Sequence, residues 1–206
     1  MTWLLLIAIP LVSALAVWTT RAGARASTVL LVTAILTSIV AIVQAAFSTV
    51  PPFLGGYVHG DSTVQLFAPV INVIYAGIAV YVRARVAIEP ASRRFVFLAL
   101  AFLAASNLAL LSNHLMLMWI GLEATTLAAA LMIVRGDAAS RLASWRYLLF
   151  SSVGLALVLL GLSCLARSRG LSGHDAPLCL GVTPAALQRP ADAWRQLGVA
   201  LAILGI

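Results

Sequence analysis

Residues 115–134 read LMLMWIGLEATTLAAALMIV, an apolar run of 20 residues that carries one charged side chain, Glu123. A helix of this length rises about 30 Å, which matches the hydrocarbon core of a bilayer. The run therefore predicts a membrane-spanning helix. At 1.5 Å per residue, Glu123 lies roughly 12 Å from its first residue and roughly 16 Å from its last, near the middle of the membrane.

The rest of the chain has the same apolar character. Of its 206 residues, 63% are hydrophobic and 9% are charged, whereas soluble domains carry about 25% charged residues. All 13 basic residues are Arg, and they flank apolar runs. The net charge of +7 therefore indicates no nucleic-acid partner, because the arginines do not gather on a water-facing surface. The composition predicts a membrane protein in contact with the lipid bilayer.

Apolar runs of bilayer length, bounded by polar residues, Gly or Pro, recur along the chain. They predict an all-α, polytopic transmembrane helix bundle in a single membrane domain over residues 1–206, with six complete spans and a partial seventh. An irregular outer loop is predicted over residues 167–193, which are rich in Gly and Pro. The predicted spans are 3–20, 27–47, 64–82, 95–111, 115–134, 147–166 and, in part, 194–206.

The arginines alternate between the two sides of these spans. Two follow the first span, four the third and three the fifth, whereas none follows the second or the fourth. Because cytoplasmic loops carry the excess of Arg, this pattern places the N-terminus outside. Four arginines after the sixth span depart from the pattern. Arg167, Arg169 and Arg189 lie in a long polar loop, where the rule is weaker, and Arg195 lies just after it.

Glu123 is the one acidic residue that lies inside a predicted span. An ionisable side chain at the bilayer centre costs at least about 2.5 kcal/mol, so it normally faces a protein interior or a water-filled path. Burial disfavours the charged form of a carboxyl group, which makes Glu123 a candidate for taking up and releasing protons. The alternative is a protonated Glu123 that only hydrogen-bonds a neighbouring helix.

Two other residues could support Glu123. Arg146 lies near the cytoplasmic end of the sixth span, about 15 Å in depth from Glu123, so we expect it to anchor that helix in the headgroups rather than to form a direct ion pair. His114, in the short outer hairpin 112–114, could lie at a proton exit or be a polar residue of the interface.

Three further polar residues inside the predicted spans are the amides Gln65, Asn72 and Asn107. Asn107, in the fourth span, is the one nearest to Glu123 in sequence. These amides could hold water beside Glu123 or could hydrogen-bond across helices.

The sequence predicts no metal site, no cofactor and no catalytic residue. Two His-Asp pairs in the loops lack a third ligand at a suitable spacing, and no nucleotide-binding or hydrolase motif occurs. Cys164 and Cys179 lack the spacing of a sulfur-ligated metal centre and can form a disulfide only if their loop faces an oxidising compartment. The loop pairs are His59 with Asp61 and His174 with Asp175.

Two blocks resemble a known family. Residues 112–127 read SNHLMLMWIGLEATTL, which resembles the fifth-helix signature of the antiporter-like membrane subunits of respiratory complex I and its relatives. The pattern Trp-x-x-x-Glu-Ala-Thr-Thr-Leu is most similar to the version in membrane-bound hydrogenases of the hydrogenase-4 and formate hydrogenlyase type. Residues 143–154 read ASWRYLLFSSVG and are similar to the start of the family's sixth helix, with Arg146 in place of the usual Lys.

The resemblance implies a non-catalytic membrane subunit of a hydrogenase or NADH-quinone oxidoreductase-like complex. Such a subunit helps to move protons, or Na⁺ in some relatives, coupled to electron transfer in a peripheral arm. The family's essential glutamate maps onto Glu123, and the family's outer N-terminus agrees with the Arg pattern. The resemblance also implies other membrane and peripheral subunits as partners, and a multi-pass location in the bacterial inner membrane.

Family members continue into a second half whose helices carry lysines, and residues 200–206 resemble the approach to that half. We therefore expect the chain to correspond to the N-terminal half of a family member, with a separate chain as one source of the other helices. The alternative function is a truncated structural or assembly subunit that translocates no ions of its own.

Overall fold

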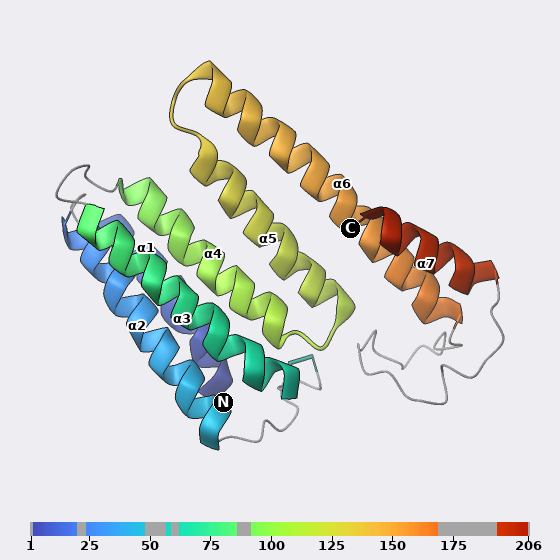
Figure 1. Ribbon diagram of the computed structural model, residues 1–206, viewed down its shortest axis with the longest axis horizontal. Coiled ribbons are helices and arrows are strands. Elements are labelled where there is room, and N and C mark those ends of the chain that lie inside the picture. Colours follow the sequence, from blue (N-terminus) through green and yellow to red (C-terminus); the bar gives the residue numbers. More distant parts are fainter. Residues whose placement is uncertain are drawn as a thin grey trace.

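Figure 1 shows the computed structural model, which describes residues 2–19, 24–47, 57–58, 62–85, 92–168 and 193–205. The regular elements in this part of the chain are helices, so the predicted all-α, polytopic transmembrane bundle is confirmed. In chain order they are η1 (Thr2–Leu4, a 3-10 helix), α1 (Leu5–Thr19), α2 (Ala24–Phe47), α3 (Ser62–Arg85), α4 (Arg93–Leu111), α5 (Leu115–Ile133), α6 (Ala138–Ser168) and α7 (Ala193–Gly205).

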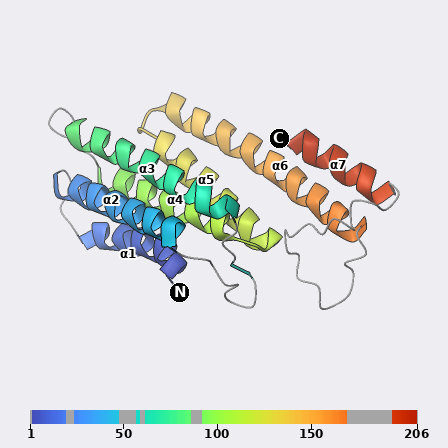
Figure 2. The ribbon, with the colours of Figure 1, turned by 60° about the horizontal axis from the view of Figure 1, so that its bottom comes forward.

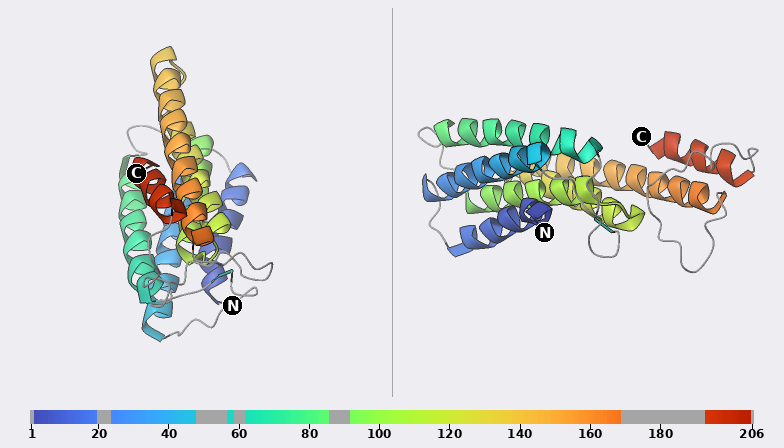
Figure 3. Two further views of the ribbon diagram at one scale, coloured as in Figure 1. Left: turned by 90° about the vertical axis from the view of Figure 1, so that its right-hand side faces the viewer. Right: turned by 90° about the horizontal axis from the view of Figure 1, so that it is seen from below.

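The helices form a bundle with an extension on one side. Helices α1 to α4 pack on one another, α5 packs on α4, α6 on α5 and α7 on α6 (Figures 1 and 2). Figure 3 shows α7 beside the second half of α6, apart from the α1–α4 bundle. The helix that carries Glu123 therefore joins the bundle to the extension.

Five helices, α2 to α6, are long and apolar enough to cross a membrane. Helix α1, with 15 residues, and helix α7, with 13, are shorter apolar helices. The first predicted span thus corresponds to η1 and α1, and its α-helical part, Leu5–Thr19, is shorter than predicted. The partial seventh span corresponds to α7.

Helix α6 begins earlier than the apolar run predicts. It starts at Ala138, nine residues before the predicted start at Tyr147. A hydropathy pattern marks the first apolar residue of a span, whereas a helix begins where its free N–H groups are capped. Arg141 and Arg146 consequently lie on α6 and not in the connection before it.

The connection before α6 has the residues of a helix start. Gly136 has a φ of +104°, a conformation that glycine adopts without a steric penalty. Asp137 then caps α6, since its Oδ2 accepts a hydrogen bond from Ser140 N at 2.9 Å. The side-chain and backbone hydrogen bonds with Ser140 hold the pKa of Asp137 below its usual value of 3.8, so the cap is ionised at neutral pH.

The α1–α4 bundle contains the main apolar core, in which large aliphatic side chains meet small alanines. Small residues let helix backbones approach closely and strengthen van der Waals packing inside a membrane. By contrast, 17% of the α5 span and 11% of the α6 span are buried, against 50% for α4, so most of the α5 and α6 surface is left to lipid or to other protein. The fully buried core includes Leu6, Val17, Leu30, Val96, Leu100 and Leu103, with Ala14, Ala26, Ala34 and Ala79.

Glycines bring α6 and α7 into backbone contact. A Cβ on Gly161 would lie 2.6 Å from Gly198 O, and a Cβ on Gly154 would lie 2.8 Å from Gly205 O. On each helix the two glycines are seven residues apart, which is about two turns, so they lie on the same side of that helix. The α6–α7 contact therefore depends on residues without side chains.

Most of the predicted outer loop lies outside the described residues, Cys179 among them. Cys164 is a buried free thiol on α6. A disulfide between the two cysteines stays a prediction.

The orientation in the membrane stays a prediction and can be tested by cysteine labelling. In a background with Cys164→Ala and Cys179→Ser, we expect Tyr57→Cys, before α3, to react with a membrane-impermeant maleimide added to intact cells. Ala139→Cys, exposed at the start of α6, should react only after the cells are permeabilised, because it lies with the arginines on the cytoplasmic side. The opposite labelling pattern would contradict the outer N-terminus.

Candidate functional site

Glu123 lies at the middle of α5 and faces α6. It is the ninth of the 19 residues of α5, as the apolar run predicts. Its Oε1 accepts a hydrogen bond of 2.5 Å from Ser152 Oγ on α6. Its Oε2 is buried and has no hydrogen-bond partner among the described residues. The carboxyl group therefore has one oxygen held by the neighbouring helix and one buried oxygen without a partner among the described residues.

The register of α5 and α6 explains why Ser152 meets Glu123. Nearer the connection between the helices, Ser144 Oγ donates a hydrogen bond of 2.6 Å to Ala130 O. Seven residues separate Ala130 from Glu123 and eight separate Ser144 from Ser152, which is the spacing of two antiparallel helices. The sequence did not predict Ser152 as a site residue. Its signals are a hydroxyl pair at 151–152 inside an apolar run and the position of that pair in the block 143–154.

The other side of α5 contacts α4 closely. A Cβ on Gly121 would lie 2.7 Å from Ala109 N and 2.9 Å from Ala109 Cβ, so only glycine fits there without a shift of one helix. Since Gly121 is two residues before Glu123, this contact fixes the height and distance of Glu123 relative to the bundle.

Arg146 does not lie beside Glu123. It is exposed on α6, six residues before Ser152, which corresponds to about 9 Å along the helix and about 120° around it. The structure thus brings Ser152 to the carboxyl group and leaves Arg146 on another face. Its headgroup anchoring stays a prediction.

His114 lies at the start of α5, away from Glu123. Its backbone carbonyl accepts a hydrogen bond from Met118 N at 2.9 Å, and its ring lies 4.9 Å from the ring of Tyr57, measured between centroids. The backbone bond is typical of a residue that caps the N-terminus of a helix. A proton exit at His114 stays a prediction.

Asn107 and Asn72 hydrogen-bond across helices. The Nδ2 of Asn72 donates to Asn107 Oδ1 at 2.9 Å, and the Nδ2 of Asn107 donates to Leu6 O on α1 at 3.0 Å. Leu6 O is the carbonyl that Pro10 leaves without its helical donor, because proline has no N–H. Of the two predicted roles for Asn107, the structure therefore shows the bond across helices.

Helix α2 joins the same network through Ser38. Its Oγ lies 2.8 Å from Asn72 O and 2.7 Å from Ala34 O. Asn72 and Asn107 are fully buried. Four helices, α1 to α4, are thus tied together at one height by satisfied polar groups.

The loop residues considered as metal ligands, His59, Asp61, His174 and Asp175, lie outside the described residues. Within the described residues, there is no group of three His, Cys, Asp or Glu side chains that could hold a metal ion. Glu123 is accordingly the centre of the candidate site.

The fold and the site define a class of protein. The chain is a multi-pass helical membrane protein in which a carboxyl group lies at mid-height between two spans, with one oxygen unsatisfied.

Comparisons with known proteins agree with this class. No protein-family model matches the chain. Over 78 residues it is 41% identical to the "Hydrogenase-4 component F homolog" of Methylacidiphilum infernorum (isolate V4), a match that covers 36% of this chain and 16% of that protein. The chain therefore matches only a small part of that relative.

Two solved structures have the same fold. A chain of the membrane-bound sulfane sulfur reductase, an archaeal respiratory membrane complex, matches 98% of this chain with a TM-score of 0.72 and 21% identity. A chain of respiratory complex I from Thermus thermophilus matches all of it with a TM-score of 0.71 and 19% identity. In each case the match covers 43% of the solved chain. The predicted resemblance is thereby confirmed: the chain is similar in sequence to part of a hydrogenase-4 component F homologue and has the fold of chains from two respiratory membrane complexes.

Asn107 provides a test of the α1–α4 network. Replacing Asn107 by Ala removes the donor to Leu6 O and the partner of Asn72, so we expect the free energy of unfolding in mixed micelles to fall by about 1 to 3 kcal/mol. The matched control is Ser106→Ala, since the Ser106 hydroxyl bonds only to Phe102 O on its own helix. Equal free energies of unfolding in the two variants would contradict a stabilising role for the Asn107 hydrogen bonds between helices.

Proposed function

We propose that the chain is a membrane subunit of a hydrogenase or NADH-quinone oxidoreductase-like complex in the bacterial inner membrane, and that it contributes to proton translocation through Glu123. The similarity to hydrogenase-4 component F and to two respiratory membrane complexes supports the kind of assembly. The proposal for Glu123 rests on the site itself.

One observation carries the proposal. The carboxyl group of Glu123 lies mid-way along a membrane-spanning helix, and its Oε2 is buried without a partner among the described residues. A strut between helices would engage both oxygens, because each unsatisfied polar atom in hydrocarbon costs free energy. An oxygen left open is the arrangement that a proton carrier requires.

The hydrogen bond from Ser152 keeps the carboxyl group oriented in both of its protonation states. The Ser152 hydroxyl donates to Oε1, so Oε2 is the atom that gains and loses the proton. A hydrogen bond to a charged acceptor is shorter and stronger than one to a neutral acceptor. Ser152 therefore stabilises the carboxylate after the proton has left, which limits the cost of the charge at that depth.

The partners we propose follow from the surface of α5 and α6. With 17% and 11% of these spans buried, both helices expose large apolar areas beside Glu123. Exposed residues there include Ile120, Leu127 and Phe150. Other membrane subunits, lipid, or a separate chain that supplies further helices would cover this surface, and peripheral subunits would carry the electron transfer.

The function can be tested with Glu123→Gln in the native membrane assembly. Gln keeps the shape of the side chain but cannot carry a proton, so we expect proton movement in inverted vesicles to fall to the level of passive leak while electron transfer and assembly persist. The matched control is Asp137→Asn, which neutralises an exposed carboxyl group but keeps a good helix cap. This control should move protons normally.

Undiminished proton movement by Glu123→Gln would overturn the role of Glu123. It would favour the alternative, a structural or assembly subunit without ion translocation of its own. Under that alternative, Gly154→Val should disturb the assembly, because its side chain would strike Gly205 O on α7.

A further inference from the structure

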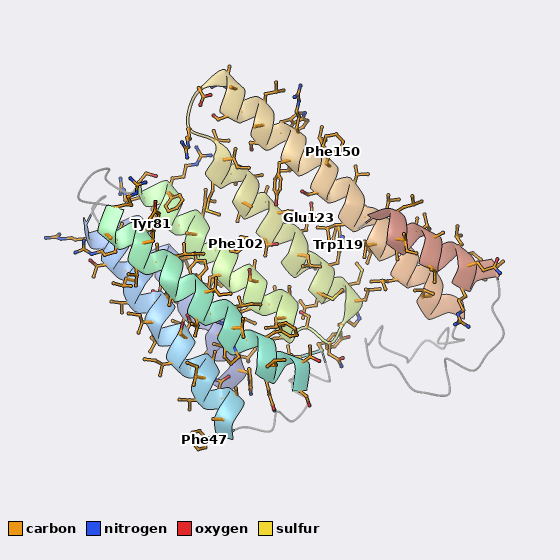
Figure 4. The ribbon with its side chains drawn as sticks, viewed as in Figure 1. Phe47, Tyr81, Phe102, Trp119, Glu123 and Phe150 are labelled. Atoms are coloured by element: carbon orange, nitrogen blue, oxygen red, sulfur yellow. The ribbon has the colours of Figure 1, made fainter. Side chains whose placement is uncertain are left out.

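A second unsatisfied polar atom lies next to Glu123. The indole Nε1 of Trp119 is buried and has no hydrogen-bond partner among the described residues, like Glu123 Oε2. Trp119 precedes Glu123 by four residues, so the two side chains lie one turn apart on one face of α5. Figure 4 labels both on the part of α5 that runs beside α6.

The direction of helical side chains brings the two atoms toward the same place. On an α-helix the Cα–Cβ bond tilts toward the N-terminus, so the Glu123 side chain leans toward the turn of Trp119. The α5–α6 register places Ala156 at the height of Trp119, and the contact of Gly121 with Ala109 places Leu111 there on α4. Neither side chain has a polar atom, so neither can satisfy the indole N–H.

The two atoms are chemically complementary. Trp119 Nε1–H is only a donor, and an ionised Glu123 Oε2 is only an acceptor. Leaving both unsatisfied inside the membrane would cost several kcal/mol for each, whereas one water molecule accepts from the first and donates to the second. Trp3 Nε1 is also buried and unsatisfied, but no carboxyl group lies one turn from it.

We infer that Trp119 and Glu123 form a water-binding site, and that the ion exchanged there is a proton and not Na⁺. The water oxygen accepts the Trp119 Nε1–H bond, and one water hydrogen is donated to Glu123 Oε2. When the site holds H₃O⁺, it transfers one proton to Oε2, which leaves a neutral carboxylic acid and the water; the reverse step returns the proton. The transport role of this site rests on the proposed function, whereas the binding of water does not.

The donor at Trp119 is what selects against Na⁺. A hard cation is bound by a shell of oxygen lone pairs, and an N–H group aimed at the same position repels it. The side-chain oxygens that this contact joins are those of the Glu123 carboxylate and the Ser152 hydroxyl. Such a set is too small to replace the hydration shell of Na⁺ but suffices to hold one water.

Infrared difference spectroscopy of the purified membrane assembly tests the site directly. Spectra are taken between acidic and alkaline buffer, in ordinary water and in ¹⁸O-labelled water. We expect an O–H stretching band that shifts with ¹⁸O, and a carboxyl band of protonated Glu123 that Glu123→Gln abolishes. Trp119→Phe should remove the water band and shift the carboxyl band to higher frequency, because the carboxyl group loses a hydrogen bond.

The matched control is Trp145→Phe, which changes an exposed Trp on α6. It should leave both bands unchanged. A water band that persists in Trp119→Phe, or that is missing from the unmodified protein, overturns the water site.

Transport separates this inference from the proposed function. In inverted vesicles, Trp119→Phe should slow proton movement by about tenfold, the effect of one lost hydrogen bond on the transfer step. Proton movement that depends on added Na⁺ overturns the ion assignment even if the water band behaves as expected. Undiminished movement in Glu123→Gln overturns the proposed function, while the water band still decides the site.

Discussion

The structure depends on one constraint, namely that hydrocarbon offers no hydrogen bonds, so every polar group in a span needs a partner from the protein. Pro10 illustrates this constraint. It deprives Leu6 O of its helical donor, and Asn107, 101 residues after Leu6 in the chain, supplies another. Hydroxyl groups meet the same demand locally. Those of Thr37, Ser106, Thr125 and Thr126 each bond to a carbonyl one turn earlier on their own helix. The hydrogen bonds between helices, such as those of Asn107 with Leu6 O and Asn72, therefore add to the apolar packing of the α1–α4 bundle.

The same constraint distinguishes a structural centre from a functional one. The antiparallel contact of Gly121 with Ala109 puts Asn107 and Glu123 at about the same height. The Asn72–Asn107 pair has its amide groups engaged, and such a closed network has nothing left to offer a ligand. Glu123 and Trp119 each keep one buried atom without a partner among the described residues, on the helix that joins the α1–α4 bundle to α6. Depth in the membrane alone would not separate these two centres.

Much of this could be predicted from the sequence, and the reasons for the rest are physical. The position of Glu123 follows from counting residues along an apolar run, because the helical rise is constant. Ser152 was missed, since its role depends on the register of two helices, which hydropathy does not encode. The start of α6 was misplaced because Asp137 and Gly136, not the apolar residues, begin that helix. The choice between the two roles of Asn107 needed the partner atoms on α1 and α3, which lie far apart in the sequence.

The position of Glu123 also links its charge to the packing of α6. Helix α5 is fixed to α4 by backbone contact at Gly121, a contact that contains no ionisable group. Toward α6, the described side-chain hydrogen bonds are those of Ser144 and Ser152, and the second ends on the carboxyl group itself. A charge-assisted hydrogen bond is roughly twice as strong as a neutral one, so the Ser152 bond weakens whenever Glu123 gains a proton. Among the described residues, α7 packs on α6. We therefore expect a weaker Ser152 bond to act first on α6 and α7, while the Gly121 contact keeps α5 on α4.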